Sequence, residues 1–129
     1  MSNNSSEKYD KFKRINSLLD FIRKNYNKNH SVQYYADLCN LDKYYFIKLF
    51  REYTTDTPLL YRTKLRIEKA KELLIKTDMT NAKIAETIGY SSSYYFSRIF
   101  KVHTGMSPDI FRKNNQWISL HFIVVDFSL

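Results

Sequence analysis

Tyrosine and basic side chains recur at the same spacing in two separate stretches of the sequence. In each stretch a basic residue follows a tyrosine after four positions, and a second basic residue follows after three more: Tyr44, Lys48 and Arg51, and Tyr94, Arg98 and Lys101. Arginine can donate two parallel hydrogen bonds to guanine, lysine and arginine bind phosphate, and apolar groups can contact the thymine methyl. On one helix face, these residue types would suit the major groove of DNA.

Catalytic and metal-binding patterns are weak by comparison. The three histidines, His30, His103 and His121, share no motif, and the sequence has no glycine-rich phosphate loop and no carboxylate pair at catalytic spacing. A single cysteine, Cys39, rules out an intramolecular disulfide and cannot by itself form a structural zinc site. We therefore expect no enzyme, no catalytic or metal-ligating residue and no cofactor.

The overall charge also favours a polyanionic partner. The chain has 21 Lys and Arg against 13 Asp and Glu, a formal charge of +8, although an excess of this size also keeps small proteins soluble. The N-terminal residues are polar, and no stretch reaches the roughly 18 apolar residues of a membrane span. We expect a cytoplasmic protein with no membrane partner.

The scarcity of helix-breaking residues predicts an all-α fold, because the 129 residues include two glycines and two prolines. Caps and apolar periodicity predict seven helices in order: Ile15 to about Asn25, a short one after Ser31, 43–53 after Asp42, a long one from Pro58, a short one after Thr80, 92–103 opened by Ser91 or Ser92, and a last one from Ser107 and Pro108 to about Asn114.

An internal repeat relates the helices that carry the basic residues. The run YYFIKLFREYTTDTP at 44–58 lies over YYFSRIFKVHTGMSP at 94–108, with six identities in fifteen positions. Upstream, Ala36 lies over Ala85 at an offset shorter by one, so the second copy has one extra residue in its turn. Each copy is thus a short helix, a tight turn and a longer helix, the arrangement of a helix-turn-helix DNA reader.

Helical periodicity gives each longer helix two faces. The apolar stripes, expected in the core, are Phe46, Leu49, Phe50 and Tyr53, and Phe96, Ile99, Phe100 and His103. The opposite faces hold the candidate DNA-binding residues Tyr44, Ile47, Lys48 and Arg51, and Tyr94, Ser97, Arg98 and Lys101. Tyr45 and Tyr95 could contact DNA or pack on the neighbouring short helix. A solvated face is the alternative for one copy, but the same pattern in two copies favours DNA.

The run IAETIGYSSSYYFSRIFKVHTGMSPDIFRK at 84–113 resembles the signature of the AraC/XylS family of transcription regulators, and the likeness covers about residues 12–114. It is carried by Gly89-Tyr90, Tyr95-Phe96, Phe100-Lys101, Thr104-Gly105 and Ser107-Pro108, and by the linker residues Leu65, Arg66, Ala70, Lys71, Leu73 and Leu74.

The resemblance implies two helix-turn-helix subdomains joined by a long linker helix, with 43–53 and 92–103 as recognition helices in successive major-groove segments. It adds Ser93 to the candidate site and makes Arg98 the first candidate for a base contact. The expected segments are a flexible lead-in at 1–12, subdomains at 13–57 and 78–114, the linker at 58–77, and an atypical apolar tail at 115–129.

Three features depart from the family pattern. Thr55 stands where the first copy usually has glycine, and Asn81 stands where the second short helix usually begins its apolar stripe. Residues 1–12 cannot hold the separate sensor or dimerisation domain that such regulators usually carry, so a small stand-alone protein and a C-terminal portion of a longer one both remain open. The tail could pack on the domain, pair between chains or be a cloning or reading-frame artefact.

The expected function is sequence-specific binding of double-stranded DNA, with RNA polymerase as a further candidate partner. The alternative is a helix-turn-helix protein-interaction module without its own sequence-specific DNA readout, in which Tyr44 and Tyr94 would serve a protein partner. RNA is disfavoured because A-form grooves do not admit a reading helix. The effector molecule and the oligomeric state are left open.

Overall fold

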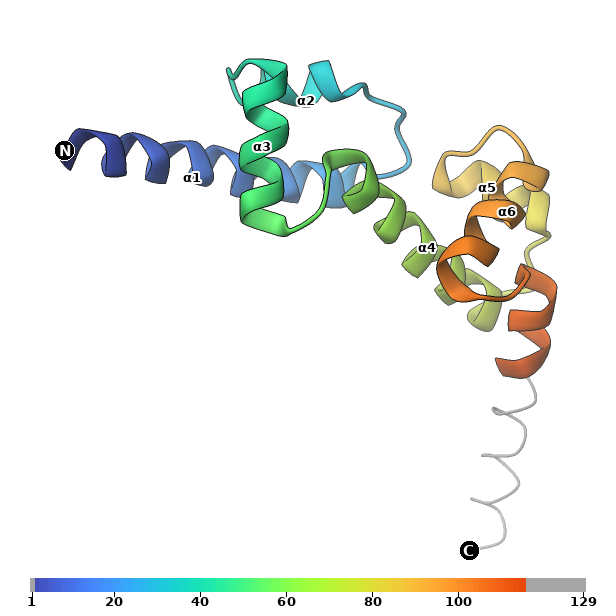
Figure 1. Ribbon diagram of the computed structural model, residues 1–129. Coiled ribbons are helices and arrows are strands. Elements are labelled where there is room, and N and C mark those ends of the chain that lie inside the picture. Colours follow the sequence, from blue (N-terminus) through green and yellow to red (C-terminus); the bar gives the residue numbers. More distant parts are fainter. Residues whose placement is uncertain (1, 116–129) are drawn as a thin grey trace, which may run out of the picture. The chain divides into compact units, whose positions relative to one another are not determined.

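The computed structural model describes residues 2–115, and within this range every regular element is a helix (Figure 1). The all-α prediction is therefore confirmed for the described chain. Six helices are α1 (Ser2–Lys24), α2 (Val32–Leu38), α3 (Lys43–Thr54), α4 (Pro58–Lys76), α5 (Asn81–Ile88) and α6 (Ser93–Thr104). A seventh runs over 108–115. The apolar tail predicted at 115–129 lies, except for its first residue, outside the described residues. Among residues 2–115, no helix is both long and apolar enough to cross a membrane.

The chain divides into two compact units between Leu65 and Arg66, inside α4. In the N-terminal unit α3 packs against α1 and α2, and in the C-terminal unit α5 packs against α6. The first half of α4 contributes Tyr61 and Leu65 to the side of the first core. The linker helix is thus shared between the two units. The boundaries at 13–57, 58–77 and 78–114 stay predictions.

The flexible lead-in predicted at 1–12 is wrong for residues 2–12, which form the first half of α1. Long side chains of this half contact α3. The Phe12 ring stacks on Tyr53 with centroids 5.4 Å apart, and Lys8 Nζ lies 3.4 Å from Glu52 Oε2. Because these contacts are made mainly by polar and isolated aromatic side chains, no apolar periodicity reveals them.

The predicted helix caps are confirmed. The side chains of Ser31, Asp42, Thr80 and Ser92 each accept a hydrogen bond from a backbone N–H in the first turn of the following helix. Of the two serines considered for the second long helix, Ser92 is the cap. Counted from the left-handed residue after each short helix, Asn40 or Gly89, the second copy has two residues before its cap, Tyr90 and Ser91, whereas the first has only Leu41. The extra residue expected in the second turn is therefore present.

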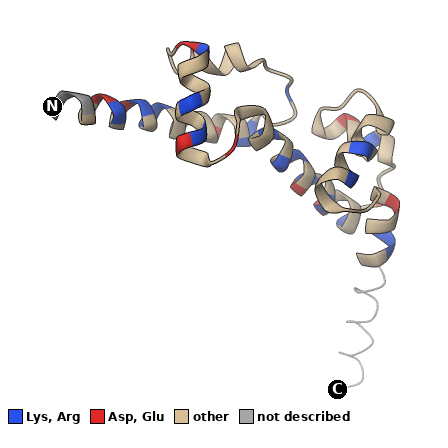
Figure 2. Ribbon diagram, viewed as in Figure 1, with Lys and Arg blue, Asp and Glu red and all other residues tan. Residues whose placement is uncertain are grey.

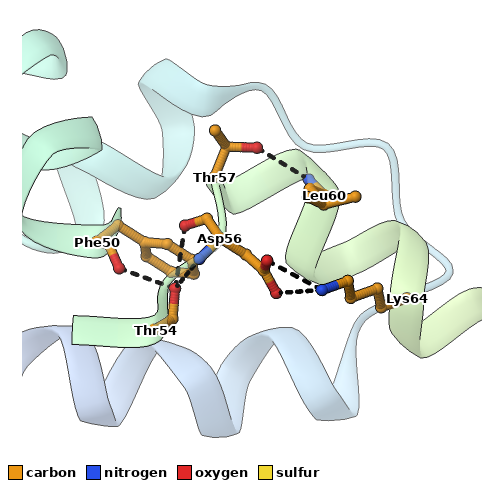
Figure 3. A network of polar contacts seen from close by, with 6 residues as sticks. All are labelled: Phe50, Thr54, Asp56, Thr57, Leu60 and Lys64. Carbon is orange, nitrogen blue, oxygen red and sulfur yellow. Dashed lines mark hydrogen bonds and ion pairs between the residues drawn. The ribbon is translucent and has the colours of Figure 1, made fainter. Parts of the chain in front are cut away.

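The turn that follows each long helix has the same hydrogen bonds in both copies, and Figure 3 shows those of the first copy. The Thr54 hydroxyl lies 2.8 Å from the Phe50 carbonyl oxygen and accepts from the N–H of Asp56 at 3.1 Å. Thr104 lies 2.8 Å from the Phe100 carbonyl oxygen and accepts from Met106 at 3.3 Å. The threonine shared by the two copies is therefore a turn-closing residue.

The departures at the two single residues Asn81 and Thr55 change local energetics and leave the fold intact. α5 still begins at Asn81, whose side-chain amide donates to Asp109 Oδ1 at 3.0 Å while its own Oδ1 is buried without a partner among the described residues. Thr55 occupies the left-handed region with φ +72°, and its counterpart Gly105 has φ +84°. A β-branched residue is strained in this region, whereas glycine is not.

Thr55→Gly is accordingly expected to stabilise the protein by about 1 kcal/mol. A residue with a Cβ is strained by about 1–2 kcal/mol in the left-handed region, and the larger conformational entropy that glycine loses on folding offsets part of this gain. Gly105→Ala should destabilise by a similar amount, since an added Cβ meets no atom within 4 Å and only backbone strain changes. Urea unfolding of both variants measures the effects. A lower midpoint for Thr55→Gly would mean that the strain at this turn is relieved in another way.

The buried stripes of α3 and α6 match most of the sequence prediction. Phe46, Phe50, Phe96 and Phe100 are fully buried and Leu49 is buried. The prediction is wrong for Tyr53 and His103, which are exposed, and Ile99 is half-buried. Positions 53 and 103 lie in the last turn of their helices, beyond the buried phenylalanines. In the first copy the Tyr53 hydroxyl instead donates to Asn16 Oδ1 on α1 at 3.0 Å.

An arginine that follows each long helix anchors the short helix of the same unit. Arg62 Nη1 donates to the carbonyl oxygen of His30 at 2.7 Å, and Arg112 Nη2 donates to that of Met79 at 2.6 Å. His30 and Met79 each directly precede the N-cap of the short helix. These charge-assisted bonds fix the backbone where α2 and α5 begin. The repeat therefore extends beyond the proline that ends the aligned run.

Candidate nucleic-acid interface

Most of the predicted site residues lie on the exposed faces of α3 and α6. Seven of the nine are exposed: Tyr44, Lys48, Arg51, Ser93, Tyr94, Arg98 and Lys101. The two remaining residues, Ile47 and Ser97, are half-buried, and Ile47 packs against the core of the first unit. The structure gathers the candidates into one group on each long helix. Ile47 can therefore offer a ligand only the exposed part of its side chain.

The short helices position the long ones through a close packing contact. α2 packs on α3, and α5 packs on α6. The alanine near the centre of each short helix, Ala36 or Ala85, is buried, as expected for a residue that lets two helices approach closely. The opposite faces of α3 and α6 remain accessible over their central turns.

The basic residues of α3 and α6 differ in their ion pairing from the lysines of α4 and α5. On α4 and α5, lysines pair with nearby carboxylates, as in Lys71–Glu68 at 3.0 Å and Lys83–Glu86 at 3.7 Å. Within residues 2–115, no carboxylate forms an ion pair with the four candidate cations Lys48, Arg51, Arg98 and Lys101. α6 contains no acidic residue and α3 contains one, Glu52 (Figure 2). Glu52 pairs with Lys8 of α1. These cations are available to an anionic ligand.

The tyrosine at the start of each exposed face lies next to a cation. Tyr44 and Tyr94 are 76% and 72% exposed, so most of each ring can contact a ligand. The Arg98 guanidinium carbon lies 5.8 Å from the Tyr94 ring centroid, and Lys43 Nζ lies 5.8 Å from that of Tyr44. Both distances fall within the range of a cation–π contact.

Tyr45 and Tyr95, for which the sequence allows either DNA contact or packing on the neighbouring short helix, make different contacts. Lys11 Nζ of α1 lies 4.8 Å from the Tyr45 ring centroid and 3.4 Å from the hydroxyl oxygen. Tyr95 meets the ring of Tyr90, in the turn, edge to face with centroids 5.4 Å apart. Both tyrosines therefore contact elements that flank the long helix, although each keeps part of its surface exposed.

The single cysteine is not available for chemistry at neutral pH. Cys39 is 2% exposed, and burial raises the pKa of its thiol from 9.0 to about 11, although the nearby Arg14 guanidinium acts in the opposite direction. The thiol is therefore protonated near pH 7, and a protonated buried thiol is a poor nucleophile and metal ligand.

Comparison with solved structures places this fold among known domains. The C-terminal domain of AraT, a response regulator from Geobacillus stearothermophilus, matches with a TM-score of 0.74 and 29% identity, covering 78% of this chain and 84% of that domain. The DNA-binding domain of AdpA, solved with a target DNA, matches with a TM-score of 0.75 over 78% of this chain and 91% of that domain. At 21% identity the second likeness shows the fold alone.

Sequence comparison assigns the family. The MmsAB operon regulatory protein of Pseudomonas aeruginosa is 32% identical over 99 residues, which are 77% of this chain and 32% of that protein. The chain spans about a third of the length of the curated relatives it matches. A family model of the helix-turn-helix domain matches residues 35–114. The chain belongs to the AraC/XylS family of transcription regulators, as a helix-turn-helix DNA-binding domain of that family.

Proposed function

We propose that the chain binds double-stranded DNA in a sequence-specific manner in bacterial transcription regulation, with α3 and α6 as recognition helices. One observation carries this proposal: both helices expose a tyrosine and two cations at the same spacing, and the cations form no ion pair within residues 2–115. Because these cations have no such ion pair to break, DNA binding would cost the face little free energy. It would add contacts to phosphates and base edges.

The residue types divide between reading and positioning. Arg98 would read guanine, because its planar fork can donate to O6 and N7 together. Lys48, its counterpart, lacks the fork and would discriminate less. Arg51 and Lys101, one turn further along their helices, would contact phosphates, and the rings of Tyr44 and Tyr94 would contact thymine methyl groups. Ser93 and Ser97 could accept or donate at a base edge.

Contacts to other proteins form a second candidate function. Val102 and Ile110 are apolar yet 78% and 51% exposed in the C-terminal unit, which suits a protein partner better than DNA. RNA polymerase would be such a partner for a regulator acting in the cytoplasm. If protein contacts were the sole function, binding to random DNA would be weak and its salt slope near zero.

Titration of Arg98→Ala and Lys48→Ala against a preferred DNA site and a scrambled one tests the first proposal. We expect Arg98→Ala to lose about 1–3 kcal/mol of discrimination, and Lys48→Ala to lose less. Lys76→Ala on α4 removes the same charge at an exposed, ion-paired position and serves as the control.

The pattern of losses decides the role of α6. Equal losses by Arg98→Ala on both DNAs, with a salt slope lower by about one, would make Arg98 a phosphate contact. If Arg98→Ala and Lys48→Ala both bound the two DNAs as tightly as Lys76→Ala does, the exposed faces of α3 and α6 would not contact DNA.

A further inference from the structure

The two long helices hold their central cation differently, although the residues correspond. On α6 the Arg98 guanidinium lies over the ring of Tyr94, four residues earlier in the chain. On α3 the corresponding residues are Tyr44 and Lys48, but the cation over the Tyr44 ring belongs to Lys43, the preceding residue. The tyrosine ring on α6 thus lies near the central cation Arg98, whereas the corresponding ring on α3 lies near Lys43 instead.

An arginine attracted to a ring keeps its hydrogen-bonding capacity while it loses freedom. At 5.8 Å between the guanidinium carbon and the ring centroid, the attraction is electrostatic, and the N–H donors stay free to bond a base. A long exposed side chain otherwise loses rotamer entropy when it binds. An exposed contact of this type changes an equilibrium constant by about two- to fivefold.

The neighbouring side chains add to the difference between the helices. On α6 the neighbours of Arg98 are the exposed Ser93 and the half-buried Ser97, whose hydroxyls can donate or accept. On α3 the position equivalent to Ser97 is Ile47, which has no polar group and packs partly against the core. The exposed face of α6 therefore has more groups able to distinguish one base pair from another.

We propose that Tyr94 is a positioning residue that orients Arg98 before DNA binds, and that α6 consequently reads the more stringent of two half-sites. This inference rests on the proposed function, in which both helices read DNA. Arg98 makes the discriminating contact, Tyr94 limits the conformations from which Arg98 starts, and α3 contributes affinity with weaker base preference.

A double-mutant cycle on the full chain measures the coupling between the two residues. The specificity ratio, affinity for a selected site over a scrambled one, is determined for wild type, Tyr94→Ala, Arg98→Ala and the double variant. Tyr94→Ala should lower the specificity ratio when it is introduced into wild type. This decrease should be about two- to fivefold larger than the decrease that the same change causes in the Arg98→Ala background. Tyr94→Phe, which keeps the ring, should retain the wild-type ratio. The same cycle on Tyr44 and Lys48 is the matched control and should be additive.

Selection from a random DNA pool supplies the second readout. The half-site whose preference disappears in Arg98→Ala should be the more sharply defined one in wild type. Additive effects at Tyr94 and Arg98, or a ratio for Tyr94→Phe as low as for Tyr94→Ala, would overturn the positioning role. An equally sharp α3 half-site would overturn the unequal reading. If wild type selected no site, the proposed function would fail and this inference with it, whereas the other outcomes leave DNA binding intact.

Discussion

Truncation of Phe100 to alanine is expected to destabilise the protein by about 3–5 kcal/mol, the usual cost of deleting a buried phenylalanine ring. The ring is fully buried and meets the rings of Phe96 and Phe111 with centroids 5.8 Å and 5.3 Å apart. Phe111 lies in the helix at 108–115, so Phe100 joins the recognition helix to the last described helix. Its removal leaves a cavity that these rings cannot fill without shifting.

Phe50→Ala should have an effect of the same size in the N-terminal unit, where its ring meets Phe46 and Tyr61 with centroids 5.7 Å away in both cases. Urea unfolding followed by circular dichroism measures both losses. Val102→Ala removes an exposed apolar side chain of α6 and should change stability by less than about 0.5 kcal/mol. Midpoints for the two phenylalanine variants that match wild type would mean that the buried stripes of α3 and α6 are wrongly assigned.

The repeat made the central part of the fold predictable. Two copies of one pattern constrain the same helix, turn and caps twice, so the sequence located the start of the first long helix at Asp42 and limited that of the second to Ser91 or Ser92. The buried phenylalanines followed from helical periodicity for the same reason. The exposed basic residues were predicted to lie opposite these stripes. The structure places all four candidate cations on the exposed side.

Contacts made by isolated or polar side chains were not predictable in this way. The first half of α1 docks on α3 through Lys8, Lys11 and Phe12, which form no apolar stripe. Similarly, periodicity cannot tell whether Lys43 or Lys48 lies over the ring of Tyr44, because side-chain rotamers decide it. The different placement of cations over Tyr44 and Tyr94 therefore appears only in the structure.

One missed feature did have a signal in the sequence. Arg62 and Arg112 stand at the same offset as the aligned repeat, four residues beyond the proline that ends it. The identity between the two copies therefore continues past that proline. The structural role explains it, since each arginine binds the backbone that precedes a short helix and so fixes the support on which α3 or α6 rests.

Sequence-specific binding is the prediction with the largest expected effect. A specific site is typically bound about 10³- to 10⁷-fold more tightly than random DNA, because several base contacts of about 1–3 kcal/mol each add to a common phosphate contribution. Two recognition helices in one chain should each read a half-site, with centres about one helical turn, or 10–10.5 base pairs, apart. The cations of both helices, which form no ion pair with any residue of 2–115, lead to this expectation for both half-sites.

Selection of bound sequences from a random double-stranded DNA pool, followed by titration of the enriched site at several salt concentrations, tests this most directly. We expect an enriched site with two half-sites about one turn apart, bound at least about 10³-fold more tightly than its scrambled version. Affinity for both DNAs should fall steeply with salt, by about 0.9 in the logarithmic slope for each phosphate neutralised. A pool that stays random after repeated rounds, with affinity independent of salt, would contradict DNA reading by α3 and α6.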